Sequence, residues 1–496
     1  MKVILNDFSA GLDKEVRSIR TNTYYDAGGF DTQSQKTKLI PFGETEAEAL
    51  TSGDITDKRF ASMVRDSNGN LIAIGRNGSG SPTVNDLFAK DSATNIASTW
   101  TAFTSDSGVG VFFPNSLVFY RSATYYIATT GRVVRKYDGS WSTVGAMDFA
   151  TSWANMLIPK PIIHPQDDIL YFGMGQNMAK INNVTYADIT SVTVPTTQYI
   201  SDFADYDNFL AIATAPTLTG NNSRVYLWDR DTSKTTFQSN IDWGEGSLMI
   251  LENLGGTLVG VSITDANYLS GTFYTTNKVK KLTISYLSGN QVFPVQEFIV
   301  DSTFSLKNFK SRIGNKVYFS GDYATSLYCV EKKKDGSIVV SKDKFLNNGT
   351  SITTLKGLYI LGDYLFTMFD TAGTSGNVRR TKVTSSYTDT SYLTTTINPS
   401  MNIYDRSKKK TLKSVTLTMS PLIAGASATV EYSVDGGAYV EILTEATDGK
   451  IATQTTRETT GKNLLPGTEY QFKIKSTGGA EIVSLEYEYE VNNTIG

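Results

Sequence analysis

The sequence has almost no histidine or cysteine. His164 and Cys329 are the only residues of their kinds among 496. A single cysteine excludes a disulfide within one chain, and a single histidine excludes most metal-ligand sets and most nucleophile–base pairs. His164 stands in the turn-like stretch PIIHPQDD, between Pro161 and Pro165, so we interpret it as a loop residue. Cys329 is interpreted as a small buried hydrophobe.

Long apolar runs and a strong net charge are also lacking. No run of 18 apolar residues occurs, and residues 1–7 have neither a long apolar region nor a signal-peptide cleavage site. Lys and Arg (46) nearly balance Asp and Glu (49), for a net charge of -3, which argues against a broad basic face that grips nucleic acid. We therefore expect no membrane anchor, no metal and no cofactor.

The sequence is rich in aromatic residues and glycine. It has 27 Tyr, 24 Phe and 41 Gly against 12 Pro, a composition that favours an all-β protein with many short turns. The length predicts more than one domain, or one large repetitive domain with an appendage.

A short apolar strand recurs on average about every 49 residues, which is the spacing of a propeller blade. Each copy follows a turn residue and is apolar nearly throughout, so we predict that it is the inner, fully buried strand of its blade. The seven copies are GNLIAIG (69–75), TYYIATT (124–130), DILYFGM (168–174), DNFLAIAT (207–214), GTLVGVS (256–262), NKVYFSG (315–321) and DYLFTMF (363–369).

A second strand follows each of these and alternates apolar with polar or basic residues, as a strand with one exposed face does. Its copies are NDLFAKD (85–91), GRVVRKYDG (131–139), NMAKINN (177–183), SRVYLWDRD (223–231), NKVKKLTIS (277–285), SLYCVEKKKDG (326–336) and NVRRTKVTS (377–385). The repeat predicts a β-propeller of about seven blades over 51–390, with six or eight blades still open and a β-helix as the alternative fold.

The last hundred residues are Thr-rich and strongly alternating, with hairpin turns at Asp435-Gly436-Gly437 and Pro466-Gly467. Val483, Leu485, Tyr487 and Tyr489 share one face of the final strand. This pattern predicts a separate antiparallel β-sandwich over 391–496, so the chain is expected to have an N-terminal strap with a first strand over 1–50, then the propeller, then the sandwich.

The sequence contains no complete motif of the kinds that usually carry chemistry. SVDGGAYVE (433–441) fails the last two positions of a sialidase Asp-box, and DRDTSKTTFQSN (229–240) lacks the glycine and the bidentate acid of an EF-hand loop. A structural Ca²⁺ at Asp202, Asp205 and Asp207 stays open beside the alternative of a solvated loop. No phosphate loop is present, no carboxylate pair can be nominated for a glycosidase, and the basic runs 332–334 and 408–410 are interpreted as solvated turn charges.

The two ends of the chain resemble those of bacteriophage tail propeller proteins. The N-terminal strap has Phe8, Ala10-Gly11-Leu12 and Phe30-Asp31 where these proteins commonly have an aromatic-x-Gly-Gly-Leu strap and an Asn- or Asp-centred stretch. Ala10 replaces the usual first glycine, and Pro41-Phe42-Gly43 matches the usual ending only loosely. At the other end, KKKTLKSVTLTMS, ATVEYSVDGGAYVEI and YQFKIKSTGGAEIVSLEYEYEV resemble the terminal sandwich of the same proteins.

The resemblance implies a virion structural protein without catalysis: a hub or nozzle component of a phage tail, made in the host cytoplasm. It implies a homo-oligomeric ring, of six copies by resemblance, that surrounds or closes the DNA channel and meets a portal–adaptor complex or a neighbouring tail ring. DNA would then be only a cargo passing through the channel during ejection. Alternatives are a receptor- or glycan-binding propeller at the tail tip, in which exposed Trp such as Trp228 and Trp243 could stack on sugars, and a glycan-cleaving propeller enzyme. Such Trp residues more often serve in the packing of blades.

The polar strap raises the question of its partner. It could lie on a neighbouring subunit, with contacts from Phe8, Leu12, Lys14, Glu15, Arg17 and Arg20. It could equally close the last blade of its own propeller. From the residues alone, both interpretations stay open.

Overall fold

The computed structural model describes most of the chain. The residues it describes are 2–7, 11–12, 23–24, 26–28, 30–31, 38–41, 45–47, 58–77, 84–90, 100–107, 112–113, 115–147, 158–183, 185–217, 222–264, 280–300, 304, 306–321, 326–345, 352–362, 364–371, 376–382, 391–397, 408–456 and 464–492. Throughout these ranges the regular structure is β-strand, so the all-β class is confirmed. The same ranges offer no helix with the length and apolarity to cross a membrane.

The chain divides into two compact units. The large unit comprises Glu46–Thr325 and Gly349–Arg380. The small unit comprises Met1–Thr45, Ser326–Asn348 and Thr381–Gly496. The N-terminal segment therefore belongs with the C-terminal strands, although the two ends of the chain are far apart in sequence.

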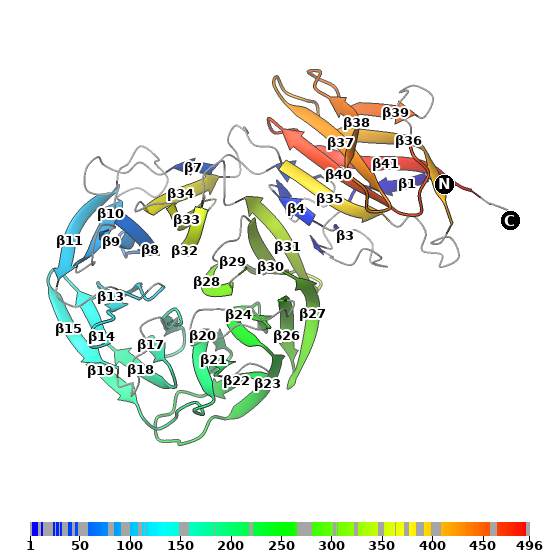
Figure 1. Ribbon diagram of the computed structural model, residues 1–496. Coiled ribbons are helices and arrows are strands. Elements are labelled where there is room, and N and C mark those ends of the chain that lie inside the picture. Colours follow the sequence, from blue (N-terminus) through cyan, green and yellow to red (C-terminus); the bar gives the residue numbers. More distant parts are fainter. Residues whose placement is uncertain are drawn as a thin grey trace. The chain divides into compact units, whose positions relative to one another are not determined.

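Seven four-stranded antiparallel sheets form a β-propeller (Figure 1). We number them in chain order as propeller sheets 1–7. Sheets 1 to 3 contain β8 (Lys58–Arg65), β9 (Leu71–Asn77), β10 (Val84–Lys90) and β11 (Thr101–Ser107); β12 (Val118–Tyr120), β13 (Ala123–Ile127), β14 (Val133–Tyr137) and β15 (Trp141–Ala146); and β16 (Ile162–His164), β17 (Ile169–Met174), β18 (Asn177–Asn182) and β19 (Thr185–Ile189).

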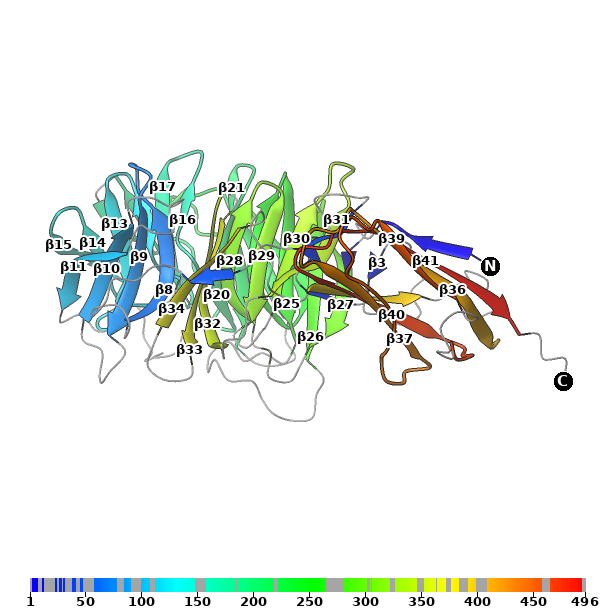
Figure 2. The ribbon, with the colours of Figure 1, turned by 90° about the horizontal axis from the view of Figure 1, so that it is seen from above.

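Sheets 4 and 5 contain β20 (Gln198–Tyr206), β21 (Phe209–Pro216), β22 (Asn222–Trp228) and β23 (Ser239–Glu245); and β24 (Ser247–Leu254), β25 (Thr257–Ile263), β26 (Lys281–Ser288) and β27 (Gln291–Ile299). Sheets 6 and 7 contain β28 (Leu306–Ile313), β29 (Lys316–Gly321), β30 (Ser326–Lys332) and β31 (Ile338–Phe345); and β32 (Ile352–Leu361), β33 (Tyr364–Thr371), β34 (Gly376–Lys382) and β7 (Thr45–Ala47). The sheets stand side by side with their hairpin turns at the two ends of the strands (Figure 2).

The first strand of each sheet is its innermost strand. β24 lies between β20 and β28, and β32 lies beside both β28 and β8, so the last sheet meets the first. The apolar strands that we expected to be innermost are instead the second strands, β9, β13, β17, β21, β25, β29 and β33. A second strand has hydrogen-bonded neighbours on both edges and packed sheets on both faces, so it is the most continuously apolar strand. The innermost strand carries more polar residues, as QYISDFADY in β20 shows.

Aromatic side chains fill the spaces between neighbouring sheets. Tyr171 of β17 and Trp228 of β22 are fully buried in one cluster, with ring centroids 6.0 Å apart. Gly173 in β17 leaves room for Phe203 of β20, because a Cβ atom at Gly173 would lie 2.7 Å from the Phe203 ring. Sheets 3 and 4 thus pack with the close complementarity typical of protein cores.

The small unit contains two antiparallel sheets that pack face to face as a sandwich. Phe472 and Tyr487 join them, with ring centroids 5.2 Å apart, and the Tyr470 hydroxyl donates to the Lys410 carbonyl over 2.6 Å. One sheet has the order β1 (Lys2–Leu5), β41 (Ile482–Val491), β36 (Lys410–Met419) and β39 (Ala452–Thr456). The other has the order β38 (Val440–Glu445), β37 (Ser427–Val434), β40 (Tyr470–Thr477), β35 (Ser391–Ile397) and β4 (Asp26–Gly28).

Candidate functional site

The N-terminal segment supplies strands to three sheets of its own chain. β1 pairs antiparallel with β41, β4 pairs antiparallel with β35, and β7 is the outermost strand of propeller sheet 7 beside β34. Shorter pairings join β2 (Gly11–Leu12) to β3 (Thr23–Tyr24) and β5 (Phe30–Asp31) to β6 (Ile40–Pro41). Among the described strands, β7 completes the last blade of the same chain's propeller, as the second interpretation of the strap expects.

Buried and charged contacts fasten this segment to the small unit. Phe30 is fully buried, and Leu39 exchanges two backbone hydrogen bonds with Ile482. The Lys38 ammonium lies 3.0 Å from Glu481, and the Lys2 ammonium lies 2.6 Å from Glu486. Both ion pairs join the segment to the residues that form or precede β41.

The residues expected at an intersubunit contact are mostly not described. Leu12 forms the end of β2 and pairs with Tyr24. The others, Phe8, Lys14, Glu15, Arg17 and Arg20, lie outside the described residues. An intersubunit role for these residues stays a prediction.

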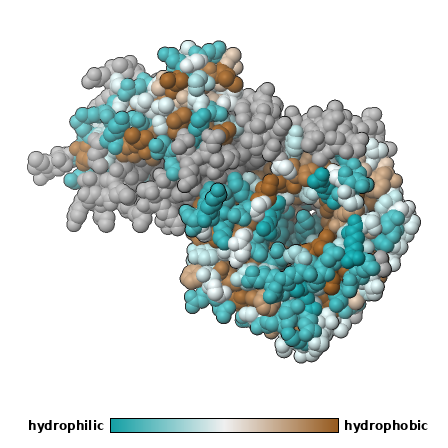
Figure 3. All heavy atoms as spheres, turned by 180° about the vertical axis from the view of Figure 1, so that it is seen from behind, coloured by the Kyte–Doolittle hydropathy of each residue, from teal (hydrophilic) through white to brown (hydrophobic). Residues whose placement is uncertain are grey.

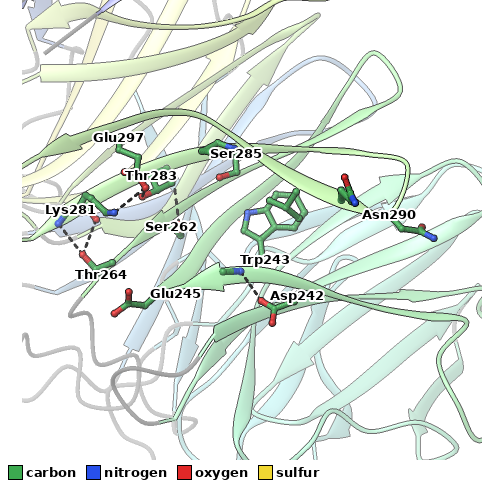
Figure 4. A pocket seen from close by; sticks show the side chains of 14 residues that line it. Asp242, Trp243, Glu245, Ser262, Thr264, Lys281, Thr283, Ser285, Asn290 and Glu297 are labelled. Carbon is green, nitrogen blue, oxygen red and sulfur yellow. Dashed lines mark hydrogen bonds and ion pairs between the residues drawn. The ribbon is translucent and has the colours of Figure 1, made fainter. Parts of the chain in front are cut away.

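A cleft of about 550 Å³ opens between propeller sheets 4 and 5 (Figure 4). The end of β23 forms one wall, and the face of β25, β26 and β27 forms the other. Its lining is mixed: three carboxylates, one ammonium, four hydroxyls, two amides, one indole and two smaller apolar side chains. These are Asp242, Glu245, Glu297, Lys281, Ser262, Thr264, Thr283, Ser285, Asn290, Gln291, Trp243, Val292 and Pro294.

Some polar groups of the cleft are held by neighbours. The Lys281 ammonium lies 2.9 Å from Glu297, whose carboxylate also accepts a hydrogen bond from the Thr283 hydroxyl. Asp242 accepts hydrogen bonds from the Asn222 amide over 2.9 Å and from the Gly244 backbone. These contacts fix one cation and two of the three carboxylates.

Other polar groups of the cleft have no hydrogen-bond or ion-pair partner for their side chains among the described residues. These are the Glu245 carboxylate, the Asn290 and Gln291 amides, the Ser285 hydroxyl and the indole N–H of Trp243. The cleft thus presents free donors and acceptors together. The sequence analysis did not find these residues because they come from four strands and a hairpin. The one local signal was Pro294 inside a strand, which marks β27 as an edge strand.

Trp243 and Trp228 are packing residues rather than exposed platforms. Trp228 is fully buried, and Trp243 is 4% exposed. Trp243 lies over Gly260 of β25, where a Cβ atom would come within 2.7 Å of the indole. The interpretation of both rings as blade packing is therefore confirmed, and the alternative of exposed rings that stack on sugars is not, although Trp243 borders the cleft.

A buried ion cluster joins three innermost strands of the propeller. The Lys310 ammonium of β28 lies 2.7 Å from Asp202 of β20 and 3.2 Å from Glu252 of β24. Burial lowers the pKa of Lys310, but the two carboxylates outweigh it and leave that pKa raised. Burial raises the pKa of Asp202 to about 6, against the opposing effects of Lys310 and the Leu251 N–H. The cluster stabilises the charged lysine within the ring of strands.

A second lysine lies close to this cluster. Burial and the positive charge of Lys310 lower the pKa of Lys160. No local sequence pattern marks this cluster, because its charged residues come from strands that are far apart in the sequence.

On the face seen in Figure 3, the centre of the propeller is hollowed and mostly hydrophilic side chains surround it.

The acidic groups tested at the sequence level are not brought together as a metal site. Among the described residues, no group of three or more His, Cys, Asp or Glu side chains could hold a metal ion. Asp202 forms an ion pair with Lys310, whereas Asp207 lies exposed in the turn between β20 and β21. Asp229 and Asp231 bind Lys234 within their own loop.

Other sequence-level interpretations have mixed outcomes. His164 is fully buried at the end of β16, with Nε2 3.2 Å from the Phe209 carbonyl, so its placement in a loop was wrong. Cys329 is buried, as expected. Asp435 caps a turn by accepting hydrogen bonds from Thr468 and Glu469. Lys410 is not a solvated charge: it is fully buried, and its ammonium donates to the Thr468 carbonyl.

Comparison with known proteins identifies no family for this chain. No protein-family model matches the chain, and no curated protein matches it in sequence. The chain is similar in structure to Raptor from Chaetomium thermophilum, with 9% identity, a TM-score of 0.45, and 69% of this chain and 29% of that chain covered. It is similar to a puromycin-hydrolyzing peptidase from Mycobacterium tuberculosis, with 8% identity, a TM-score of 0.44, and 71% and 60% covered.

A third similar structure is the β-propeller domain of the trilobed protease from Pyrococcus furiosus. It is 11% identical, with a TM-score of 0.38, and the match covers 65% of this chain and 96% of that domain. This chain spans less than two thirds of the length of both Raptor and the peptidase. The similarities concern the propeller fold alone.

Proposed function

We propose that this chain is a structural protein of a bacteriophage tail, a hub or nozzle component without catalytic activity. In this proposal, copies assemble as a ring around the DNA channel and dock on a portal–adaptor complex or a neighbouring tail ring. The resemblance of both chain ends to tail propeller proteins motivates it. The observation that carries it is the path of the N-terminal segment, whose strands complete both sheets of the small unit and propeller sheet 7.

This path supports a rigid building block. β1 pairs residues 2–5 with residues 485–488, and propeller sheet 7 combines residues 45–47 with strands from 352–382. Such closures are non-local, so neither the sandwich edge nor the last blade can open without separating segments that lie far apart in the sequence. A wall that keeps its shape while DNA passes needs this kind of closure.

The surface of the small unit offers a contact for a neighbouring copy. Ile423 and Ile451 are 62% and 57% exposed, and their two loops are joined by the hydrogen bond from the Leu422 N–H to the Lys450 carbonyl. Exposed isoleucines on two neighbouring loops favour contact with another protein surface. We place this pair in the contact between ring subunits.

The charge balance supports a role in which DNA is only a cargo. With 49 acidic and 46 basic side chains, the chain lacks the excess of cations that phosphate binding requires. A channel wall of this composition lets DNA slide past without holding it.

The test is quantitative mass spectrometry of purified particles of the virus that encodes the chain, together with electron microscopy of the purified protein. We expect several copies per particle, rings in the micrographs, and loss of rings in the variant Ile423→Asp with Ile451→Asp. The matched control is Thr447→Asp, an exposed position in the same unit. We also expect His164→Ala to leave ring assembly unchanged. Absence of the chain from particles would contradict the proposal, as would polysaccharide hydrolysis that disappears on substitution of one carboxylate.

A further inference from the structure

We propose that the cleft between propeller sheets 4 and 5 binds a carbohydrate that is neutral or carries an amino group. This role goes beyond the structural one and does not depend on ring formation. The cleft lies wholly within the large unit. Its volume of about 550 Å³ falls in the range of small-ligand sites, about 300–1,000 Å³.

The free polar groups of the cleft match a polyhydroxylated ligand. The Glu245 carboxylate can only accept hydrogen bonds, whereas the Asn290 and Gln291 amides and the Ser285 hydroxyl both donate and accept. Each hydroxyl of a sugar also donates and accepts, so it can pair with any of these groups. A purely apolar ligand would leave them all unpaired, which is unfavourable.

Trp243 provides an independent indication of a ligand. This residue is only 4% exposed, and its Nε1–H has no hydrogen-bond partner. The nitrogen edge of the indole is turned toward the hydroxyl-bearing side chains of β25 and β26, among them Ser262 and Thr283 (Figure 4). Buried N–H groups are normally paired, so an unpaired one on the wall of a cleft fits a missing acceptor, such as a sugar oxygen.

The charges of the cleft select among sugars. Asp242, Glu245 and Glu297 face a single ammonium, that of Lys281, which already pairs with Glu297. The net negative charge disfavours sialic and uronic acids by repulsion and favours neutral or amino sugars. The unpaired indole N–H, the amides and the net negative charge together indicate a neutral sugar or an amino sugar.

The experiment is calorimetric titration of the full chain with oligosaccharides of glucose, N-acetylglucosamine and glucosamine, and with sialyllactose. We expect at least one of the first three to bind with millimolar or better affinity, and sialyllactose not to bind. Glu245→Gln and Asn290→Ala should each weaken binding about tenfold, because the first replaces a charged acceptor with a weaker neutral one and the second removes the amide. The control Asp207→Asn makes the same chemical change as Glu245→Gln at an exposed turn outside the cleft.

Tryptophan fluorescence gives a second readout at the site itself. Binding should shift the emission of the wild-type chain, and Trp243→Phe should remove that shift. If Trp243→Phe fails to fold, the affinities of Glu245→Gln and Asn290→Ala still test whether the sugar binds in the cleft. Failure of all four oligosaccharides to bind, equal affinities in the cleft variants and wild type, or stronger binding of sialyllactose would overturn the inference. Because none of these results involves ring formation, they are distinguishable from failure of the structural role.

Discussion

Replacing Lys310 with methionine probes the ion cluster at the innermost strands. Methionine has a similar length but no charge, so Asp202 and Glu252 would remain close together without their shared cation. Removing one partner from a buried ion pair typically costs about 3–5 kcal/mol, because the remaining charge is buried without compensation. We expect Lys310→Met to lower the free energy of unfolding of the large unit by about this amount near pH 7.5.

The loss of stability caused by Lys310→Met should be smaller at low pH than at high pH. The pKa of Asp202, about 6 in the folded state, lies above its ordinary value of 3.8. The folded state therefore holds more protons than the unfolded state between these values, so this group's contribution to stability falls as the pH rises through the window and is level above it. Without the lysine, the folded pKa rises further, since Lys310 is the cation that lowers it. The variant should thus be less destabilised near pH 5 than near pH 7.5.

Urea unfolding followed by tryptophan fluorescence measures the loss of stability of the large unit. All five tryptophans lie in the sequence range of the large unit, at positions 100, 141, 153, 228 and 243. The control is Lys234→Met, which removes a half-exposed ammonium and should change stability by about 0–1 kcal/mol. Adding Asp202→Asn to Lys310→Met should restore part of the loss. A change below about 1 kcal/mol, or the same loss at both pH values, would refute the reasoning.

Three further predictions concern packing, a second buried ion pair and the N-terminal strand. Gly173→Ala places a methyl 2.7 Å from the Phe203 ring and should lower stability by about 1–3 kcal/mol in the same urea assay. Arg135→Met leaves Asp106, whose side chain is 3% exposed, without its bidentate cation and should lower stability by about 3–5 kcal/mol, whereas Arg135→Lys should lower it less. Deleting residues 2–5 should speed hydrogen exchange of the β41 amides without moving the fluorescence midpoint, because β1 covers the edge of β41.

The propeller could be recognised from the sequence because its second strands are sheltered on all sides. A strand such as β17, ILYFGM, reads as a continuous apolar run at a regular spacing. The innermost strands could not be identified in this way. In β28, LKNFKSRI, Lys310 is buried and pairs with carboxylates on two other strands. The sequence around Lys310 contains no pattern that predicts this pairing.

The candidate site was less accessible to sequence reasoning than the fold. The strap was recognised as a distinct segment, but its pairing with β41 and β35 joins residues hundreds of positions apart. The cleft depends on Glu245 at the end of one sheet and Asn290 in a hairpin of the next. Isolated polar residues that lie far apart in the sequence form no periodic pattern. Only the three-dimensional structure shows that they lie together.

The central claim is tested most directly by cryo-electron microscopy of intact particles of the virus that encodes this chain. The proposed function predicts a closed ring of copies around the axis of the tail channel, with the exposed loops of Ile423 and Ile451 at the contacts between subunits. A map in which the chain is missing from the particle, or occurs only as separate copies away from the channel axis, would contradict it.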